Sequence, residues 1–507
     1  MLCPSAASLA IAGGAGITAL TSPGRPTQAE EVKVADDLPT PHELLAALPG
    51  ELTPKVPLDV NRDLQKKVRD QKKFAEEQLL FDLLSWRTFV ALNWPVDAAG
   101  NPQPKITDPG RKYWDTWKTD LDTFLPDGAK PASWGSNHLN QYLAARGIQA
   151  GAGTRVLDSL SSVHGHLSFK ISKVPDVIQA FKFPIWDQNG NMLRYEILLN
   201  QDEFDYIVAN DLYSLDGQAA FSMKGGKVGF PMDNPESGKL GAMELKLAWK
   251  VLDPSKGDLP ERFLTVKATI FSGPDGTTPT QATLGLVAMH ISHRTQSSPQ
   301  WIWSTFIHVD SLQTNSLATF HGKPIPTLFY NPGNPTALVN VPSQTACPFL
   351  DGQTPTQVLA LTPIPLATQE VNRVARLELE KRGSVLHYYE LMNTQWPTSP
   401  ATPPTPPGML PASIDNKAGG RPTPVYLINP LMETYFQAGN QQAGPQEQAG
   451  TEQTLVFGTE SCVGCHSSAP VITAVTVGPN GVKTAVQGPA FSGEFSWLLF
   501  RRAQFTK

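Results

Sequence analysis

The chain has 507 residues, of which 40% are hydrophobic and only 17% are charged, and its formal net charge is −5. This length allows about two to four domains with ordinary hydrophobic cores, and the lack of a basic block argues against nucleic acid as a partner. The 46 prolines, 40 glycines and 11 tryptophans indicate a chain rich in strands and turns rather than a helical bundle.

The N-terminus resembles a secretory signal peptide. Residues 6–20 form an apolar run of small residues, and a cleavage site can follow Ala29. No Lys or Arg precedes the run, so a mildly apolar, disordered N-terminus remains the alternative. We expect residues 1–29 to be removed on export, which places a bacterial protein in the periplasm or outside the cell. The mature chain is expected to contain no transmembrane segment.

Residues 30–95 predict an N-terminal arm with helices. Apolar side chains recur at helical spacing between Leu64 and Phe89, which favours one or two helices there. One of Asp59, Asn61 and Asp63 is expected to cap a helix N-terminus.

Residues 96–396 predict a large β-rich domain with added helices. Asn189-Gly190 is typical of a type I′ hairpin turn, a short helix is expected around residues 202–210, and further helices are expected at 368–382 and 384–396. Alternating apolar stretches predict strands at 243–252, 263–273, 283–295 and 301–312, with the last two paired antiparallel. The predicted fold class is α+β, with an antiparallel sandwich or barrel in this domain.

The last quarter of the chain predicts a separate, mainly helical segment. A Pro-rich linker at residues 397–411 leads into residues 412–507, where we expect short helices near 429–437 and 492–503 and a Gly/Pro loop at 477–490. Cys347, upstream of the linker, is expected to be a buried free thiol.

The stretch SCVGCHSSA contains Cys462, Cys465 and His466 in the pattern C-x-x-C-H. Two thiols three residues apart can bind the two vinyl groups of haem, and the following histidine can bind the iron as an axial ligand. A zinc site would require a second Cys or His pair nearby, and three or four cysteines in so long a chain do not make a disulfide framework. The motif therefore predicts one covalently attached haem c (heme c), with His466 as the metal ligand.

The sixth iron ligand is not evident from the motif, because no Met or His follows His466. Met/His ligation would suit electron transfer, whereas an open position would permit chemistry on small ligands. Arg501, Arg502 and Trp497 could donate to haem propionates or lie on a surface helix. The candidate distal ligands upstream are Met432, Met409, Met289, His290, His293 and His308, or none.

Six stretches in this order carry a family resemblance: SWRTFVALNWP, MELKLAWKVL, LGLVAMHISHRT, PQWIWSTFIHVD, HYYELMNTQWP and SCVGCHSSA. From about residue 80 onward the chain resembles bacterial proteins described as "cytochrome c family", with a large N-terminal domain and one C-terminal haem motif. The resemblance implies an exported monohaem protein and supplies no substrate. Only Cys462, Cys465 and His466 take a defined role from it.

Three functions fit these observations. The first is electron transfer in the periplasm, with a redox partner protein. The second is a haem enzyme of peroxidase or oxygenase type, an oxidoreductase with a small-molecule substrate between the large domain and the haem. The third is a non-catalytic haem sensor or binding module. One haem without an evident catalytic constellation favours the first.

Overall fold

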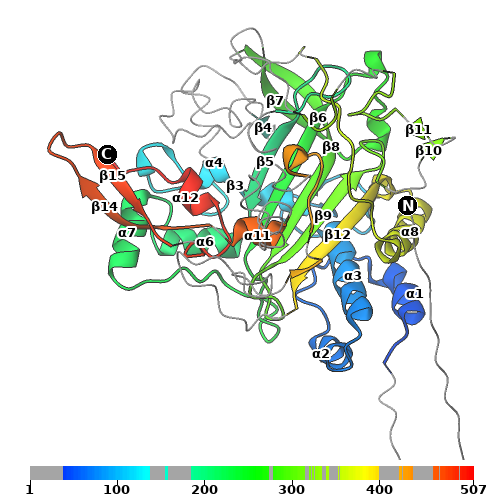
Figure 1. The fold of residues 1–507 in the computed structure, drawn as a ribbon, viewed down its shortest axis with the longest axis horizontal. Helices are drawn as coiled ribbons and strands as arrows, with labels where there is room; N and C mark the ends of the chain where they lie inside the picture. Colours follow the sequence, from blue (N-terminus) through cyan, green and yellow to red (C-terminus); the bar gives the residue numbers. More distant parts are fainter. Residues whose placement is uncertain are drawn as a thin grey trace, which may run out of the picture. The chain divides into compact units, whose positions relative to one another are not determined.

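A nine-stranded sheet forms the centre of the structure (Figure 1), which is a computed structural model. Its strands run in the order β13–β12–β9–β8–β6–β5–β3, with β7 beside β8 and β4 beside β7. The neighbours are antiparallel except for β4 and β7, which are parallel. The strands are β3 Lys118–Thr119, β4 Arg155–Leu157, β5 Arg194–Leu199, β6 Met243–Val251, β7 Thr265–Ser272, β8 Thr278–His293, β9 Ile302–His308, β12 Tyr389–Pro397 and β13 Pro422–Thr423.

The described residues belong almost entirely to one compact unit, residues 39–507. The signal-like segment 1–29, Cys347, Met409 and residues 399–411 of the predicted linker lie outside them. The structure describes residues 38–136, 155–157, 184–272, 278–314, 319–320, 323–324, 326–333, 338–341, 352, 354–398, 422–424, 426–437, 461–467, 469–489 and 491–507.

The helices follow the sequence signals at several of their ends. Asn61 accepts a hydrogen bond from the Leu64 amide (3.1 Å) and so caps α2, as expected of one of the three polar residues there. Gly383, with a φ of +69°, follows the end of α8, where a left-handed residue favours glycine. The helices are α1 Pro41–Glu51, α2 Arg62–Asp70, α3 Phe74–Leu92, α4 Asp120–Thr123, α6 Gln201–Ala209, α7 Leu215–Met223, α8 Leu366–Lys381, α11 Cys462–His466 and α12 Leu498–Arg502. Short 3₁₀ turns are η1 Tyr113–Thr116, η2 Pro126–Gly128, η4 Pro254–Lys256, η5 Pro260–Arg262, η6 Val385–Tyr388 and η8 Thr434–Phe436.

Helices α1, α3 and α8 cover one face of the sheet, which we call the helix face (Figure 1). Phe89 of α3 stacks on Phe306 of β9 with ring centroids 4.1 Å apart. The indole of Trp86 donates to Asn372 of α8 over 2.8 Å. Nearly every residue of α3 from Leu79 onward is buried, so this face holds the largest hydrophobic core.

The opposite face of the sheet carries the C-terminal part of the chain, and we call it the C-terminal face. Asn429 donates to the Thr305 hydroxyl of β9 over 2.9 Å, and the ring of His466 in α11 packs against Trp303 of β9. Side chains alternate between the two faces along each strand. Met289 and Ile291 of β8 thus join the helix-face core, and the intervening His290 lies on the C-terminal face.

Two predictions for the large domain are wrong. The predicted sandwich or barrel is a single open sheet, because helices cover one face and the C-terminal segment covers the other. The helix expected at 384–396 is η6 followed by β12, whose nine residues are all buried. A strand buried on both faces shows no simple alternation, so its pattern does not separate it from a buried helix.

Two turn predictions also need correction. At Asn189-Gly190 the chain does reverse, but only Gly190 has a positive φ (+77°), whereas a type I′ turn needs two such residues. The Asp187 carboxylate instead accepts from the amides of residues 189 and 191. The loop expected at 477–490 is largely a hairpin, β14 Ile472–Val477 and β15 Lys483–Gln487, because Val and Thr residues flank a tight turn there. Two further hairpins pair β1 Pro95–Val96 with β2 Arg111–Lys112, and β10 Thr319–Phe320 with β11 Lys323–Pro324.

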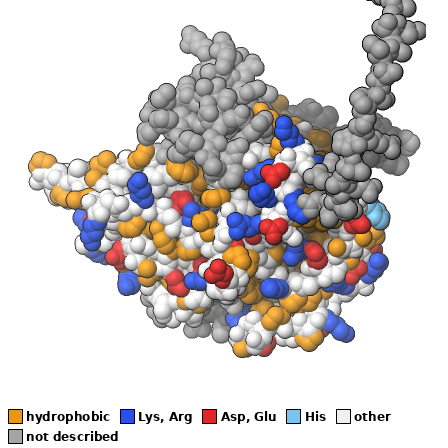
Figure 2. All heavy atoms as spheres, turned by 90° about the horizontal axis from the view of Figure 1, so that it is seen from below, with side chains coloured by type: hydrophobic (Ala, Val, Ile, Leu, Met, Phe, Trp, Pro, Cys, Tyr) orange, Lys and Arg blue, Asp and Glu red, His pale blue; other side chains and the backbone are white. Residues whose placement is uncertain are grey.

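Charged side chains of both signs are interspersed with hydrophobic ones over the surface drawn in Figure 2. None of the helices in the described residues combines the length and the apolar character that crossing a membrane requires.

Candidate haem site

The predicted haem motif forms the short helix α11, Cys462–His466. Ser461 caps it, because its hydroxyl accepts from the Gly464 amide (3.1 Å). Cys462 and Cys465 are half-buried free thiols. One helical turn therefore presents two thiols and an imidazole, which is the donor set that a c-type haem requires.

Gln395 of β12 anchors this helix to the sheet. Its buried side chain accepts from the Val463 amide (2.8 Å) and donates to the Ser461 hydroxyl (2.9 Å). It also donates to the carbonyl of Pro424 (2.7 Å). The motif is thus fixed to strand β12 of the main sheet by buried hydrogen bonds, which hold a helix of this length more firmly than its own turns can.

The ring of His466 is held in one tautomer. Its Nδ1 lies 2.7 Å from the carbonyl oxygen of Phe495, and because a carbonyl can only accept, Nδ1 must carry the proton. Burial lowers the pKa of His466 to about 4, so the ring is neutral at pH 7 and Nε2 keeps its lone pair. A hydrogen bond to the second nitrogen is how proteins orient a metal-binding imidazole.

The loop that supplies this carbonyl has an unusual backbone. Phe491, Glu494 and Phe495 have φ values of +76°, +47° and +71°, and left-handed non-glycine residues each cost about 1–3 kcal/mol. Glu494 secures the loop through an ion pair with Arg294 and by accepting from the Phe230 amide (2.9 Å). Such strain is typical of functional sites, and here it aims the Phe495 carbonyl at His466.

The two thiols do not have the properties of a redox pair or a zinc site. Burial raises the pKa of Cys465 to about 11 and raises that of Cys462 well above its usual range, whereas reactive dithiols have a lowered pKa. Across the described part of the chain, no three His, Cys, Asp or Glu side chains converge in a way that could hold a metal ion directly.

A polar triad, Lys246, His290 and Glu433, lies on the C-terminal face beside the motif. Lys246 and His290 are cross-strand partners on β6 and β8. Glu433 lies 3.0 Å from His290 Nε2 and 3.6 Å from Lys246 Nζ, and its carboxylate also accepts from the Asn429 amide (2.7 Å). Together these contacts lower the pKa of Glu433 to about 2 against the effect of its burial.

The triad is close to the haem motif. His290, Lys246 and Glu433 all contribute to the electrostatic surroundings of His466, and Lys246 interacts with both Cys462 and Cys465. Their side chains keep 15–18% of their exposure, so the triad is largely but not completely buried.

Sequence reasoning named His290 but missed its two partners. Lys246 is one of three charged residues, with Glu244 and Lys250, in the strand MELKLAWKVL, so its position carried no distinct signal. Glu433 is separated from His290 by 143 residues, and no sequence pattern reports such a contact.

The described candidates for the distal iron ligand lie on two different faces of the sheet. Met289 and His293 are an odd number of residues from His290 along β8, so their side chains lie on the opposite, helix face of the sheet. There the sulfur of Met289 accepts a hydrogen bond from the Asn93 side chain. His308 follows Ile307 on β9 and so lies on the same face as Phe306, where the edge of its ring packs against Tyr389 of the helix-face core. Three candidates on the helix face thus cannot reach α11 without crossing the sheet.

Two candidates remain on the C-terminal face. Met432 is fully buried in the core cluster that includes Ala288 and Ile307, beside Glu433 in the chain. His290 is partly exposed and belongs to the triad. Among the described candidates, His290 is the one that is both accessible and within electrostatic range of His466.

The three residues considered for haem propionates take different positions. Arg502 forms an ion pair with Asp120 (2.5 Å). Arg501 lies over the ring of Trp497, whose indole donates to the Cys465 carbonyl (3.3 Å). Trp497 therefore contacts the haem motif directly, whereas Arg502 is buried in its ion pair with Asp120 of α4.

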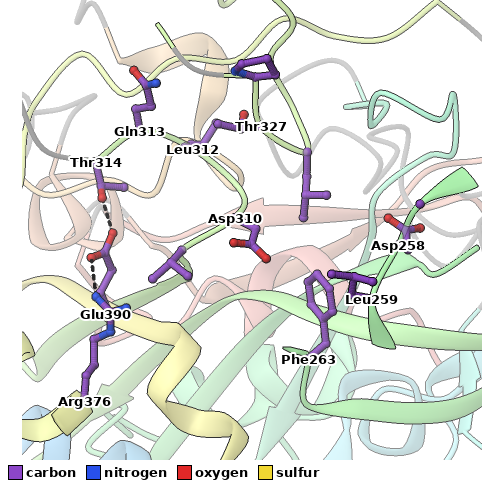
Figure 3. A pocket seen from close by; sticks show the side chains of 14 residues that line it. Asp258, Leu259, Phe263, Asp310, Leu312, Gln313, Thr314, Thr327, Arg376 and Glu390 are labelled. Atoms are coloured by element: carbon purple, nitrogen blue, oxygen red, sulfur yellow. Dashed lines mark hydrogen bonds and ion pairs between the residues drawn. The ribbon is translucent and has the colours of Figure 1, made fainter. Parts of the chain in front are cut away.

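A separate cavity of about 490 Å³ lies near the end of β9 (Figure 3). Its charged lining residues already have partners of opposite charge: Asp258 pairs with Lys250, Asp310 with Arg262, and Glu390 with Arg376. Figure 3 shows Thr314, Glu390 and Arg376 in one chain of contacts at the cavity wall. These pairings do not indicate a particular ligand.

Comparison with protein-family models, curated proteins and solved structures finds no match to this chain.

Proposed function

We propose that this chain is an exported c-type cytochrome that carries one covalent haem c on Cys462 and Cys465. His466 would be the proximal iron ligand, and the protein would take part in periplasmic electron transfer. The observation that carries the proposal is the hydrogen bond between His466 Nδ1 and the Phe495 carbonyl, which leaves Nε2 available next to two free thiols.

The donor set fits the proposed group. Thioether bonds to both cysteines would fix the haem beside α11, and the neutral imidazole of His466 would supply one axial nitrogen. When bound, the haem supplies a one-electron couple. The protein contributes the fixed helix, the oriented imidazole and an apolar contact with Trp303.

The remaining parts of the proposal follow from the sequence. The signal-like N-terminus supports export and a periplasmic location, and the resemblance to bacterial "cytochrome c family" proteins agrees with both. An electron-transfer role implies a periplasmic redox partner protein that docks near the haem.

A haem enzyme of peroxidase or oxygenase type is the second candidate, favoured by the polar triad. An electron carrier does not need a Lys–His–Glu cluster beside its motif, whereas a positioned histidine or carboxylate can transfer a proton to a substrate. A small-molecule substrate would then bind between the sheet and the haem.

Haem staining of the purified protein on a denaturing gel tests the proposal. The wild-type chain, produced with a bacterial haem-attachment system, should stain, and the double variant Cys462→Ser/Cys465→Ser should not. Cys347→Ser is the matched control, because it removes a thiol outside the motif and should stain like the wild type. Staining that persists in the double variant would refute covalent attachment at this motif.

Carbon monoxide separates the two candidate functions. Rapid binding of carbon monoxide to the reduced wild-type protein would show an open or weakly held sixth position and favour the enzyme. Failure to bind it would favour electron transfer with a firmly held sixth ligand.

A further inference from the structure

A further cavity, of about 500 Å³, lies beside the segment that links α1 to α2. Its walls are this linker, the first residues of α2, Arg87 of α3 and Pro235. None of the residues that line it belongs to the haem motif or to the polar triad. Its volume lies in the range of small-molecule binding sites, about 300–1,000 Å³, so the cavity could hold a ligand of its own.

The linker that forms the main wall is fixed to the rest of the molecule at both ends. At its start, Arg382 of α8 donates to the carbonyls of Pro49 and Leu52 over 2.6 Å each. Near its end, the Asp59 carboxylate accepts from the amide (2.8 Å) and the hydroxyl (2.5 Å) of Ser297. The cavity is therefore formed before any ligand arrives, which lowers the entropy cost of binding.

Positive side chains outnumber negative ones in the lining of this cavity. The charged lining residues are Lys55, Arg62, Arg87, Asp59 and Asp63. Three positive and two negative groups give the lining a net charge of +1, in a chain whose formal net charge is −5. Asp59 and the nearby Asp233 already accept hydrogen bonds from the turn between β8 and β9. These two acids are thus engaged with the protein itself.

The three cations have little compensation from carboxylates. Arg62 Nη1 donates to the neutral side chain of Gln296 over 2.6 Å. Arg87 pairs with Glu51 at 3.4 Å, but the two side chains are 34% and 45% exposed, and exposed pairs of this kind are weak. Lys55 is exposed, and its ammonium group has no hydrogen bond or ion pair with any residue that the structure describes. The cavity therefore offers positive groups that an anion can use.

We propose that this cavity binds a small organic anion, with Lys55 and Arg87 recognising its carboxylate or phosphate group. A guanidinium group pairs with such oxyanions through two parallel hydrogen bonds, and an ammonium group adds a compact charge. Pro57, Val60 and Pro235 also line the cavity and can contact the carbon skeleton of the ligand. This site is separate from the haem motif, and the inference does not rest on the proposed cytochrome function.

Calorimetric titration of the purified mature protein at low ionic strength tests the inference with three small probes. Succinate presents carboxylates and glycerol 3-phosphate presents a phosphate, so the two anions distinguish the recognised group. Putrescine has the carbon chain length of succinate but carries positive charges, and it is the control probe. The variants are Lys55→Gln and Arg87→Gln. Lys66→Gln is the matched control, because Lys66 is an exposed cation of α2 that pairs with Asp70 and does not line the cavity.

We expect the wild type to bind at least one of the two anions with a Kd of about 1 mM or tighter. Lys55→Gln and Arg87→Gln should each weaken this binding by about tenfold or more, because each removes a hydrogen bond between charged groups. Added salt should weaken it as well, whereas Lys66→Gln should match the wild type. Lys55→Gln removes no side-chain contact within the described structure, so its unfolding temperature should equal that of the wild type.

Three results would overturn the inference. The first is a wild type that binds neither succinate nor glycerol 3-phosphate. The second is binding of putrescine as tight as that of the anions. The third is unchanged anion binding in a folded Lys55→Gln variant and in Arg87→Gln. Since none of these measurements depends on haem, their failure would leave the proposed cytochrome intact, and a protein without covalent haem would leave the anion site intact.

Discussion

Replacing Gln395 with leucine tests whether the sheet holds the haem motif in place. Leucine is similar in size but cannot form hydrogen bonds, so the Val463 amide and the Pro424 carbonyl would lose their buried partner. Each unpaired buried group costs about 1–3 kcal/mol, so the two together favour undocking of α11 by about 2–6 kcal/mol. At the lower bound the undocked population rises about 30-fold.

Hydrogen exchange, read by mass spectrometry on the peptide that contains residues 461–467, measures this undocking. The Gln395→Leu variant should exchange in that peptide at least about 30-fold faster than the wild type. Gln369→Leu is the matched control, because Gln369 donates to one backbone carbonyl at the start of α8, on the helix face. Unchanged exchange of the motif peptide in Gln395→Leu would refute the anchoring role.

Two further predictions concern stability. Phe89→Ala should lower the free energy of unfolding by about 3–5 kcal/mol in denaturant titrations, because Phe89 is buried against Phe306. Phe74→Ala, at a position that is 49% exposed, should lower it far less. Equal losses in the two variants would contradict the assignment of Phe89 to the core. Burial raises the pKa of Glu494 from 4.5 to about 7, even beside Arg294. The unfolded chain therefore loses this proton first as pH rises, and the free energy of unfolding should fall by up to about 3 kcal/mol between about pH 4.5 and 7. Glu494→Gln should remove that fall. If the free energy of unfolding had the same pH dependence in the wild type and in Glu494→Gln, the raised pKa of Glu494 would be contradicted.

The sequence predicted the elements whose periodicity is simple. Strand β6 was expected within one residue of its observed bounds, and strands β8 and β9 were expected with ends that differ by up to five residues, because apolar residues recur at alternating spacing. The helical spacing between Leu64 and Phe89 predicted one or two helices, and the structure has two there, α2 and α3. Strand β12 was not, because it is buried on both faces. The number of sheets could not be predicted either, since it depends on which segment covers each face.

The site was predictable in part for a different reason. Cys462, Cys465 and His466 lie within five residues of one another in the chain, so their spacing alone indicates haem chemistry. The carbonyl of Phe495 was not predictable, because a backbone acceptor has no residue signature. The triad depends on the pairing of β6 with β8 and on a segment more than 140 residues away, and only the fold brings these side chains together.

Peptide mass spectrometry of the mature, purified protein tests the central claim most directly. The peptide that contains Cys462, Cys465 and His466 should carry the mass of one haem through two thioether bonds. The same peptide recovered with two free thiols or an internal disulfide, from cells that attach haem to a control cytochrome, would contradict the account.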